Sequence, residues 1–290
     1  MTDVLVVGRG RLGLSLQRAL EVAGVECRLL PATLEAESLA GVRAARDPLV
    51  VFAVPDQHIA GVAMCFAQAE GISSGTSFVH LSGAHGLEAL EPLAAGGHGI
   101  GCFHPLQPFP AVRGPEAFYG TFFAVNASSP ALRARLDELA RSIGGHSKPL
   151  ADAWRPLYHA AAVMASTYVV VLAAQAGLML QAVGWEPEES LLALLPLMRG
   201  ALDNLATERL PGGLNGPMRR GDASTVANHV AAIAKATPPL EPDTLQIYQQ
   251  LGSVALRLAV AAGLGEEQAA ALVEALGPRT LDAERELSSS

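Results

Sequence analysis

The stretch VLVVGRGRLG near the start of the chain constrains the fold more than any other feature of the sequence. It places Gly8, Gly10 and Gly13 after an apolar run that predicts a strand and before residues 11–23, whose leucines recur at helical spacing. The first glycine permits a tight turn, the second lets the backbone approach a pyrophosphate, and the third lets the helix pack close to the strand. This order predicts a dinucleotide site with the phosphates at the helix N-terminus, and a tight turn without a ligand is the alternative.

Strands and helices alternate through the first half of the chain. Apolar runs predict strands at 3–8, 25–30, 49–55, 76–83, 99–103, 121–126 and 146–150, and helical spacing predicts helices at 11–23, 59–69 and 129–143. This alternation predicts an α/β domain of the Rossmann type over residues 1–150, with a doubly wound parallel sheet.

The second half of the chain shows no strand pattern. Helices are predicted at 152–183, 187–207, 222–236, 241–263 and 266–276, with a loop over PGGLNGP at 211–217. We therefore expect an all-helical domain over residues 151–290.

Composition narrows the partners and the compartment. The chain has a net charge of −8 and no basic run, which argues against nucleic acid because phosphate binding needs clustered Lys and Arg. Cys27, Cys65 and Cys102 lie far apart and form no CxxC pair, which indicates a reduced, cytoplasmic protein. The first residues, MTDVLVVG, lack the basic region of a signal peptide.

Residues 156–185 contain no charged side chain, so a membrane-spanning helix has to be considered. Six polar residues are spread along this segment, and no basic flank marks one end. We expect a soluble protein in which this segment is a long helix buried on most of its faces.

The choice of cofactor depends on the end of the second strand. An NAD site usually has an acidic residue there, whereas the sequence CRLLPATLE has Arg28 and no acid at the strand end. Arg9 and Arg11 lie inside the glycine loop, next to Leu12, and arginines can hold a 2′-phosphate by paired hydrogen bonds. This pattern favours NADP over NAD, although each arginine could instead be a solvated surface charge.

Two later strand ends supply further candidates, because ligands of open α/β sheets bind beyond the carboxyl ends of the strands. Val54, Pro55 and Asp56 end the third strand and are expected to border the cofactor, with an N-cap role as the alternative for Asp56. Ser82 ends the fourth strand and is expected to position the substrate.

The stretch CFHPLQPF follows the next strand and predicts a stiff apolar wall with two polar groups, His104 and Gln107, facing the nicotinamide. A proline-rich turn over the core is the alternative. Four histidines fall between residues 80 and 104, but their spacing matches no usual metal site, so we expect no metal.

The helical half supplies candidates for substrate chemistry. His159 lies on the uncharged segment, on one helix face with Val163, Ser166 and Thr167, and could protonate a developing alkoxide. A core histidine bonded to a carbonyl is the alternative. Asn204 and Arg220 are candidate substrate contacts, with Arg220 holding an anionic group, and Asp222 is expected to cap the helix that follows it.

Six motifs together resemble a known family: VVGRGRLG, FAVPD, VHLSGAHGLEAL, CFHPLQPF, YHAAAVMAST and GPMRRGDASTVANH. They resemble Rossmann-like NADP oxidoreductases with a C-terminal helical domain formerly of unknown function. The overall plan is similar to 6-phosphogluconate dehydrogenase, 3-hydroxyisobutyrate dehydrogenase, pyrroline-5-carboxylate reductase and ketopantoate reductase. The resemblance implies a C-terminal domain like that of 6-phosphogluconate dehydrogenase, reduction of a carbonyl or imine with NADPH, a ketopantoate-like substrate and a homodimer joined through the helical domains.

The sequence departs from these relatives at two positions. The hydroxyacid dehydrogenases carry a lysine on the first long helix, where this chain offers His159, and the family's usual asparagine is replaced by Thr167. These departures leave open a second function, that of a non-catalytic protein that binds or senses a dinucleotide.

Overall fold

The computed structural model describes residues 3–32, 36–45 and 47–278. Contacts divide the chain into two compact units, Met1–Thr167 and Tyr168–Ser290. The sequence predicts the division near residue 150, whereas the contacts place it after Thr167. The helix Arg155–Ala165 therefore belongs to the first unit.

The first unit is built on a seven-stranded sheet in the order β2-β1-β3-β4-β5-β6-β7. All neighbouring pairs are parallel except β5 and β6, which pair antiparallel. The strands are β1 (Val4–Val7), β2 (Cys27–Leu30), β3 (Leu49–Phe52), β4 (Ser77–His80), β5 (Gly99–Pro105), β6 (Phe122–Ala127) and β7 (His146–Pro149). The Rossmann-type α/β architecture is thus confirmed, with one correction to the expected parallel sheet.

The antiparallel pair has a simple cause. A parallel connection needs a crossover, usually an α-helix, and only the short 3-10 turn η3 (Pro115–Phe118) lies between β5 and β6. The chain therefore returns beside β5 in the opposite direction.

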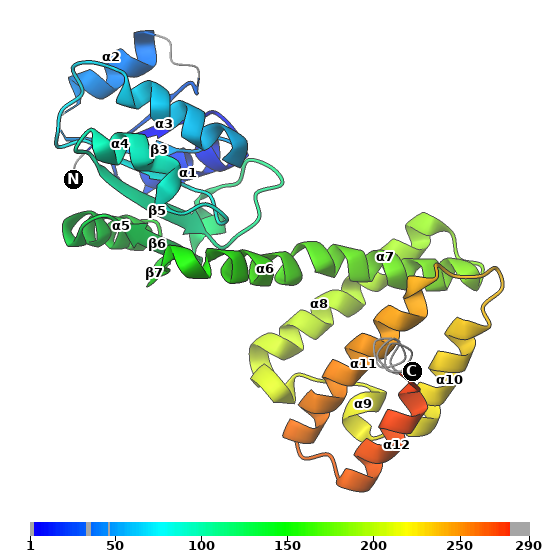
Figure 1. Ribbon diagram of the computed structural model, residues 1–290. Helices are drawn as coiled ribbons and strands as arrows, with labels where there is room; N and C mark the ends of the chain where they lie inside the picture. Colours follow the sequence, from blue (N-terminus) through cyan, green and yellow to red (C-terminus); the bar gives the residue numbers. More distant parts are fainter. Residues whose placement is uncertain (1–2, 33–35, 46, 279–290) are drawn as a thin grey trace, which may run out of the picture. The chain divides into compact units, whose positions relative to one another are not determined.

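Helices cover both faces of the sheet (Figure 1), in two apolar layers. One layer is formed with α1 (Arg11–Val22), α5 (Pro130–Ser142) and η3, and the other with α2 (Ala36–Ala44), α3 (Ile59–Ala67), η2 (Leu87–Leu90) and α4 (Glu91–Ala95). The unit also contains η1 (Asp56–His58), η4 (Asp152–Trp154) and α6 (Arg155–Ala165). The strands β1 and β3 are buried throughout, which explains their unbroken apolar sequence.

The stretch CFHPLQPF is only in part a loop. Its first four residues, Cys102 to Pro105, continue β5 and pair with β6, with His104 opposite Ala124. The prolines do not prevent this, because Pro105 is the last residue of the strand.

The uncharged segment 156–185 is not one helix. Helix α6 ends at Ala165, because the backbone of Ser166, with a φ of −124° and a ψ of −70°, leaves the helical region, and α7 (Thr167–Ala182) follows. The expectation that the segment is buried on most faces is wrong for the isolated chain, since 11% of its most apolar window is buried. By length and composition alone, Asp152–Ala182 is also the one stretch among the described residues that could cross a membrane.

The second unit is all-helical over its described residues, as the sequence predicts. It contains most of α7, followed by α8 (Pro187–Gly212), α9 (Pro217–Arg220), α10 (Ala223–Ala234), α11 (Asp243–Ala261) and α12 (Glu266–Leu276). Its core is formed by Met218, Val226, Leu256, Leu272 and Leu276. The backbone of α8 leaves the helical region at Arg209 and Leu210, so its long regular part ends close to the predicted residue 207.

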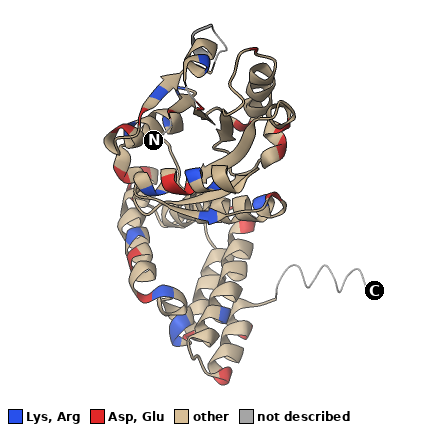
Figure 2. Ribbon diagram, turned by 90° about the vertical axis from the view of Figure 1, so that its left-hand side faces the viewer, with Lys and Arg blue, Asp and Glu red and all other residues tan. Residues whose placement is uncertain are grey.

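Charged side chains are distributed over both units. Lys and Arg positions are interspersed with Asp and Glu along the ribbon (Figure 2).

The antiparallel pair of strands provides a test of the core. The rings of Phe103 and Phe123 stack with centroids 4.3 Å apart, and Phe123 is 1% exposed, whereas its neighbour Phe122 is 46% exposed. Phe123→Ala is expected to lower the free energy of unfolding by about 3–5 kcal/mol, because it removes a buried ring and leaves a cavity. Urea unfolding measures the change. Phe122→Ala is the matched control, with an expected loss below about 1 kcal/mol; equal losses would contradict the described register.

Candidate functional site

The glycine loop is shaped by three glycines with different roles. Gly8 has a φ of +122°, and a Cβ there would collide with the carbonyl oxygen of Ala53. A Cβ at Gly13 would collide with the carbonyl oxygen of Gly8, so this glycine sets the close packing of α1 on β1. A Cβ at Gly10 would meet only the Ala53 oxygen, at 4.0 Å. The fold therefore does not require a glycine at position 10, but the missing side chain lets a ligand approach the backbone of the loop closely.

The N-terminus of α1 is open to an anion. Gly10 is the N-cap, no side chain caps the helix, and no acidic residue lies in its first turn. The free N–H groups and the helix dipole at such an end favour phosphate. A cavity of about 280 Å³ adjoins this end, lined by Gly10, Arg11, Leu12, Ala53, Val54, Pro55, Asp56 and Leu81. The residues present thus fit a dinucleotide whose pyrophosphate lies against the helix end.

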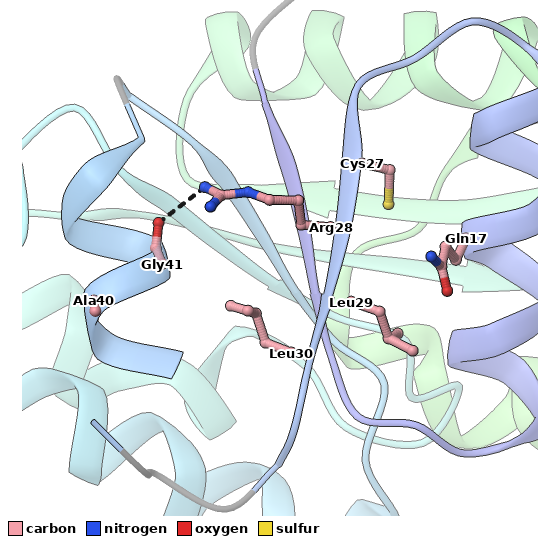
Figure 3. Close-up of a pocket in the computed structure, with 7 residues that line it drawn as sticks. All are labelled: Gln17, Cys27, Arg28, Leu29, Leu30, Ala40 and Gly41. Carbon is pink, nitrogen blue, oxygen red and sulfur yellow. Dashed lines mark hydrogen bonds between the residues drawn. The ribbon is translucent and has the colours of Figure 1, made fainter. Parts of the chain in front are cut away.

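The arginines proposed for a 2′-phosphate lie near this loop or on the edge strand. Arg9 and Arg11 are exposed at the loop itself. Arg28, on β2, donates to the carbonyl oxygen of Gly41 in α2 at 3.0 Å (Figure 3). Its guanidinium lies beside a cavity of about 600 Å³, lined by Gln17, Cys27, Arg28, Leu29, Leu30, Ala40 and Gly41.

Asp56 and Ser82 form a structural pair at the strand ends. The Ser82 hydroxyl donates to Asp56 at 2.8 Å and accepts from the N–H groups of Ala84 and His85. The alternative considered for Asp56, an N-cap role, is wrong, because Pro55 is the N-cap of η1 and no side chain caps that turn or α3. Ser82 is 5% exposed, so its hydroxyl is committed to shaping the turn.

A third cavity, also of about 600 Å³, is lined by most of the residues predicted for catalysis and substrate binding. It is lined by His104, Leu106, Gln107, Pro108, Tyr158, His159, Ala161, Ala162, Val163, Ala165, Ser166 and Thr167. The structure thus brings together four predicted residues: His104, Gln107, His159 and Thr167. Gln107 donates to the carbonyl of Ala117 at 3.3 Å, whereas His159 is exposed.

A hydrogen bond between His104 and Tyr158 forms one side of this cavity. The Nδ1 atom of His104 lies 2.7 Å from the Tyr158 hydroxyl, and the two rings meet edge to face at 88°. Burial and, to a smaller extent, the nearby Arg155 cation together lower the pKa of His104 to about 4. Burial raises the pKa of Tyr158 to about 12, against the opposing effect of Arg155. Both groups are therefore neutral near pH 7.

The Arg155 cation is buried and acts electrostatically on both members of this pair. It is 1% exposed, bonds Asp152 through Nε at 3.1 Å and donates to the Ser82 carbonyl at 3.4 Å. Asp152 also accepts from the Leu87 N–H and the Asn126 amide, both at 2.8 Å. These hydrogen bonds hold the pKa of Asp152 below its ordinary value despite the opposing desolvation. The Nη2 atom of Arg155 is buried without a hydrogen-bond partner among the described residues.

His80 and Cys102 form a separate buried contact. The Nδ1 atom of His80 accepts a hydrogen bond from the Ser82 N–H, so the ring proton lies on Nε2. The Nε2 atom lies 2.9 Å from the Gly86 carbonyl oxygen and 3.0 Å from Cys102 Sγ. Burial lowers the pKa of His80 to about 4 and raises that of Cys102 to about 12. This contact is neutral and structural.

Other candidates lie outside the three cavities described for the first unit. Asn204 and Arg220 are exposed residues of the second unit. Asp222 caps α10 by accepting from the Thr225 N–H at 3.0 Å, which confirms its expected role. Among the described residues, no group of three or more His, Cys, Asp or Glu side chains is placed to hold a metal ion.

Sequence reasoning missed Tyr158 and Arg155. Tyr158 directly precedes His159, and the signal that could have found it is its place one residue from a singled-out histidine. Arg155 was hidden because a lone arginine beside an apolar segment predicts a helix flank. Its burial depends on contacts with Asp152 and Ser82, and the latter is 73 residues away along the chain.

Two family models match the chain. A Rossmann-like domain matches residues 2–105, and DUF2520, a domain of unknown function, matches residues 121–255. The chain carries a Rossmann-like domain joined to a DUF2520 domain. The resemblance stated from the six motifs is thereby confirmed. No curated protein sequence matches the chain.

Solved structures share the same fold. A Thermotoga maritima protein is 24% identical with a TM-score of 0.67, over 89% of this chain and 99% of that chain. A proposed NADP oxidoreductase from Bacteroides fragilis is 21% identical with a TM-score of 0.62, over 88% of this chain and 98% of that chain. The Plasmodium falciparum pyrroline carboxylate reductase, solved with NADP bound, is 12% identical with a TM-score of 0.53, over 93% and 98%. The Rossmann–DUF2520 chain therefore shares the fold of these three proteins.

The two buried histidines make stability depend on pH. Histidine in the unfolded chain titrates near its ordinary pKa of 6.5, whereas His80 and His104 titrate near 4 in the folded chain. Between these values the unfolded chain binds more protons, so the free energy of unfolding is highest above pH 6.5 and falls as the pH drops toward 4. Urea unfolding from pH 6.5 to 5 is expected to show this decline, and His104→Gln should make it shallower. An unchanged slope in that variant would contradict the described burial.

Proposed function

We propose that this protein is an NADP-dependent oxidoreductase that transfers a hydride to the carbonyl or imine carbon of a small keto or imino acid. A ketopantoate-like acid is the first candidate substrate. One observation carries the proposal: the uncapped N-terminus of α1, with Gly10 open to a ligand, belongs to the same compact unit as the cavity containing His104 and Tyr158. The fold shared with the reductases supports it.

The chain's own residues account for binding. The α1 N-terminus would hold the pyrophosphate, and Val54, Pro55 and Asp56 would border the cofactor. Arg9, Arg11 and Arg28 favour NADP, because no acidic side chain stands at the end of β2 to bond a ribose hydroxyl. Bound NADPH supplies the hydride.

The cavity walls suit a small substrate. Leu106, Pro108, Ala162 and Val163 give an apolar lining that excludes water, while Gln107, His159 and Thr167 offer polar contacts. Asn204 and the exposed guanidinium of Arg220 are proposed to bind the anionic group of the substrate. We propose a small molecule as the partner of this site, rather than nucleic acid or a membrane. The net charge of −8 and the scattered basic residues favour this choice.

A non-catalytic dinucleotide sensor is the second candidate. The cavity contains no lysine, and Ser82, expected to position the substrate, has its hydroxyl committed to Asp56 and two backbone N–H groups. A sensor would bind NADPH without consuming it. Turnover of NADPH with any keto or imino acid decides between the two functions.

A homodimer is proposed for the helical unit. Apolar side chains on α7 and α8 are exposed in the single chain, including Val170 at 70%, Leu192 at 60% and Leu197 at 71%. A second copy covering them would remove a large apolar surface from water. The three unpaired cysteines support a cytoplasmic location for this dimer.

Gly10→Ala tests the cofactor site. The variant is expected to keep the wild-type melting temperature, since only the Ala53 oxygen lies near the added methyl, but to weaken NADPH binding by at least about tenfold because the methyl fills the pyrophosphate approach. Isothermal titration calorimetry measures the binding. Gly61→Ala is the matched control, because Gly61 lies in α3 with nothing within 4 Å of the added methyl. Wild-type affinity in Gly10→Ala would place the dinucleotide elsewhere.

Sedimentation in detergent-free buffer tests the dimer. The wild-type protein is expected to have twice the 30.0 kDa mass of one chain, and Leu197→Glu to shift the population toward the monomer, because it buries a charge in the interface. A soluble wild-type monomer would contradict the dimer. Protein that stays in solution only with detergent would instead favour a membrane role for Asp152–Ala182.

A further inference from the structure

The geometry points to Tyr158 as the proton donor of this site, with His104 and Arg155 as the residues that position and support it. This inference rests on the proposed function, since a proton donor is needed where a hydride reaches a carbonyl or imine carbon. It assigns the role to Tyr158 in place of its neighbour His159.

Position separates the two candidates. Adjacent residues of a helix point about 100° apart, so Tyr158 and His159 present their side chains to different parts of the cavity wall. The Tyr158 hydroxyl is fixed by His104 at 2.7 Å, and its ring by the edge-to-face contact with the imidazole. His159 is exposed, and no hydrogen bond to another described residue is assigned to its ring. A general acid must be held in place before its acidity matters.

The tautomer of His104 leaves the phenolic proton available. The Nε2 edge of the ring packs against Gly83, where a Cβ would lie 2.8 Å from Nε2, and no acceptor for an Nε2–H is found among the described residues. We assign the proton to Nδ1, which then donates to the Tyr158 oxygen. The Tyr158 O–H is therefore free to point at a ligand in the cavity.

The buried cation supports the charge that follows. When the Tyr158 O–H bond breaks, its proton passes to the substrate oxygen or nitrogen and the electron pair stays on the phenolate. The Nδ1–H of His104 then donates to an anion, which strengthens the bond, and the positive charge of Arg155 faces it. A proton from solvent restores the phenol, so the chain is unchanged after each reduction.

The surrounding charges are consistent with this arrangement. His104 faces Arg155, His159, Asp56 and His80, and burial together with the Arg155 cation lowers its pKa to about 4. Near pH 7 His104 is therefore neutral and carries a single ring proton, which we assign to Nδ1.

Tyr158→Phe is the central test, because it removes one hydroxyl from a half-buried ring and keeps the packing. NADPH oxidation is followed with a panel containing ketopantoate, other 2-keto acids and pyrroline-5-carboxylate. The variant is expected to lose about 10²–10⁴-fold in kcat, the usual contribution of a general acid, with KM and the NADPH affinity within about threefold of wild type. Tyr119→Phe, at a 62% exposed tyrosine, is the matched control.

Two further variants separate positioning from structure. Gly83→Ala pushes its methyl against the His104 ring and is expected to lower kcat at least about tenfold without changing NADPH affinity. Nitrogen NMR of the His104 ring supplies a readout apart from activity. Arg155→Met should raise the pKa of His104 by removing the cation, and Arg155→Lys should keep it low.

The outcomes are distinct. A wild-type protein that oxidises NADPH while Tyr158→Phe keeps more than a tenth of its kcat overturns the assignment and leaves the proposed function intact. A larger loss in His159→Gln than in Tyr158→Phe also overturns it. A wild-type protein that binds NADPH but does not oxidise it with any acid of the panel contradicts the proposed function. That result also overturns the assignment of Tyr158 as the proton donor.

Discussion

The buried ion pair of Asp152 and Arg155 is the interaction on which the site depends. Asp152 joins the start of α6 to the Leu87 N–H and to Asn126 on β6, and Arg155 reaches the Ser82 carbonyl after β4. An arginine that is 1% exposed is tolerated only because its charge is paired and hydrogen-bonded. Through this pair, α6 is fixed beside the sheet, and Tyr158 is thereby brought to His104.

The fold was largely predictable because its signals are local. The GxGxxG loop, the apolar strands and the alternation of strands and helices each depend on residues close together in sequence. The antiparallel β5–β6 pair was missed because an apolar run does not reveal strand direction. The break at Ser166 was missed because the sequence carries no proline or glycine there. The exposure of α7 was missed because apolar composition alone does not distinguish a helix buried in its own chain from one whose apolar surface is exposed.

The site was predictable only in part. His104, Gln107, His159 and Thr167 were singled out from the sequence and lie around one cavity. Ser82 and Asp56 were also singled out, but they bond each other, which no spacing of 26 residues could have indicated. Tyr158 and Arg155 emerge only when α6 is placed against β5, because their partners are 54 and 73 residues away in sequence. Long-range contacts of this kind define the chemistry, while local patterns define the scaffold.

The central claim is that this Rossmann–DUF2520 protein moves a hydride rather than merely binding a nucleotide. The most direct measurement is mass spectrometry of the products after incubation with NADPH carrying deuterium at the transferable position of the nicotinamide, across a panel of keto and imino acids. The account predicts one product that gains a single deuterium on the former carbonyl or imine carbon. NADPH that binds tightly yet remains undiminished, with no labelled product, would contradict the account and identify the protein as a dinucleotide sensor.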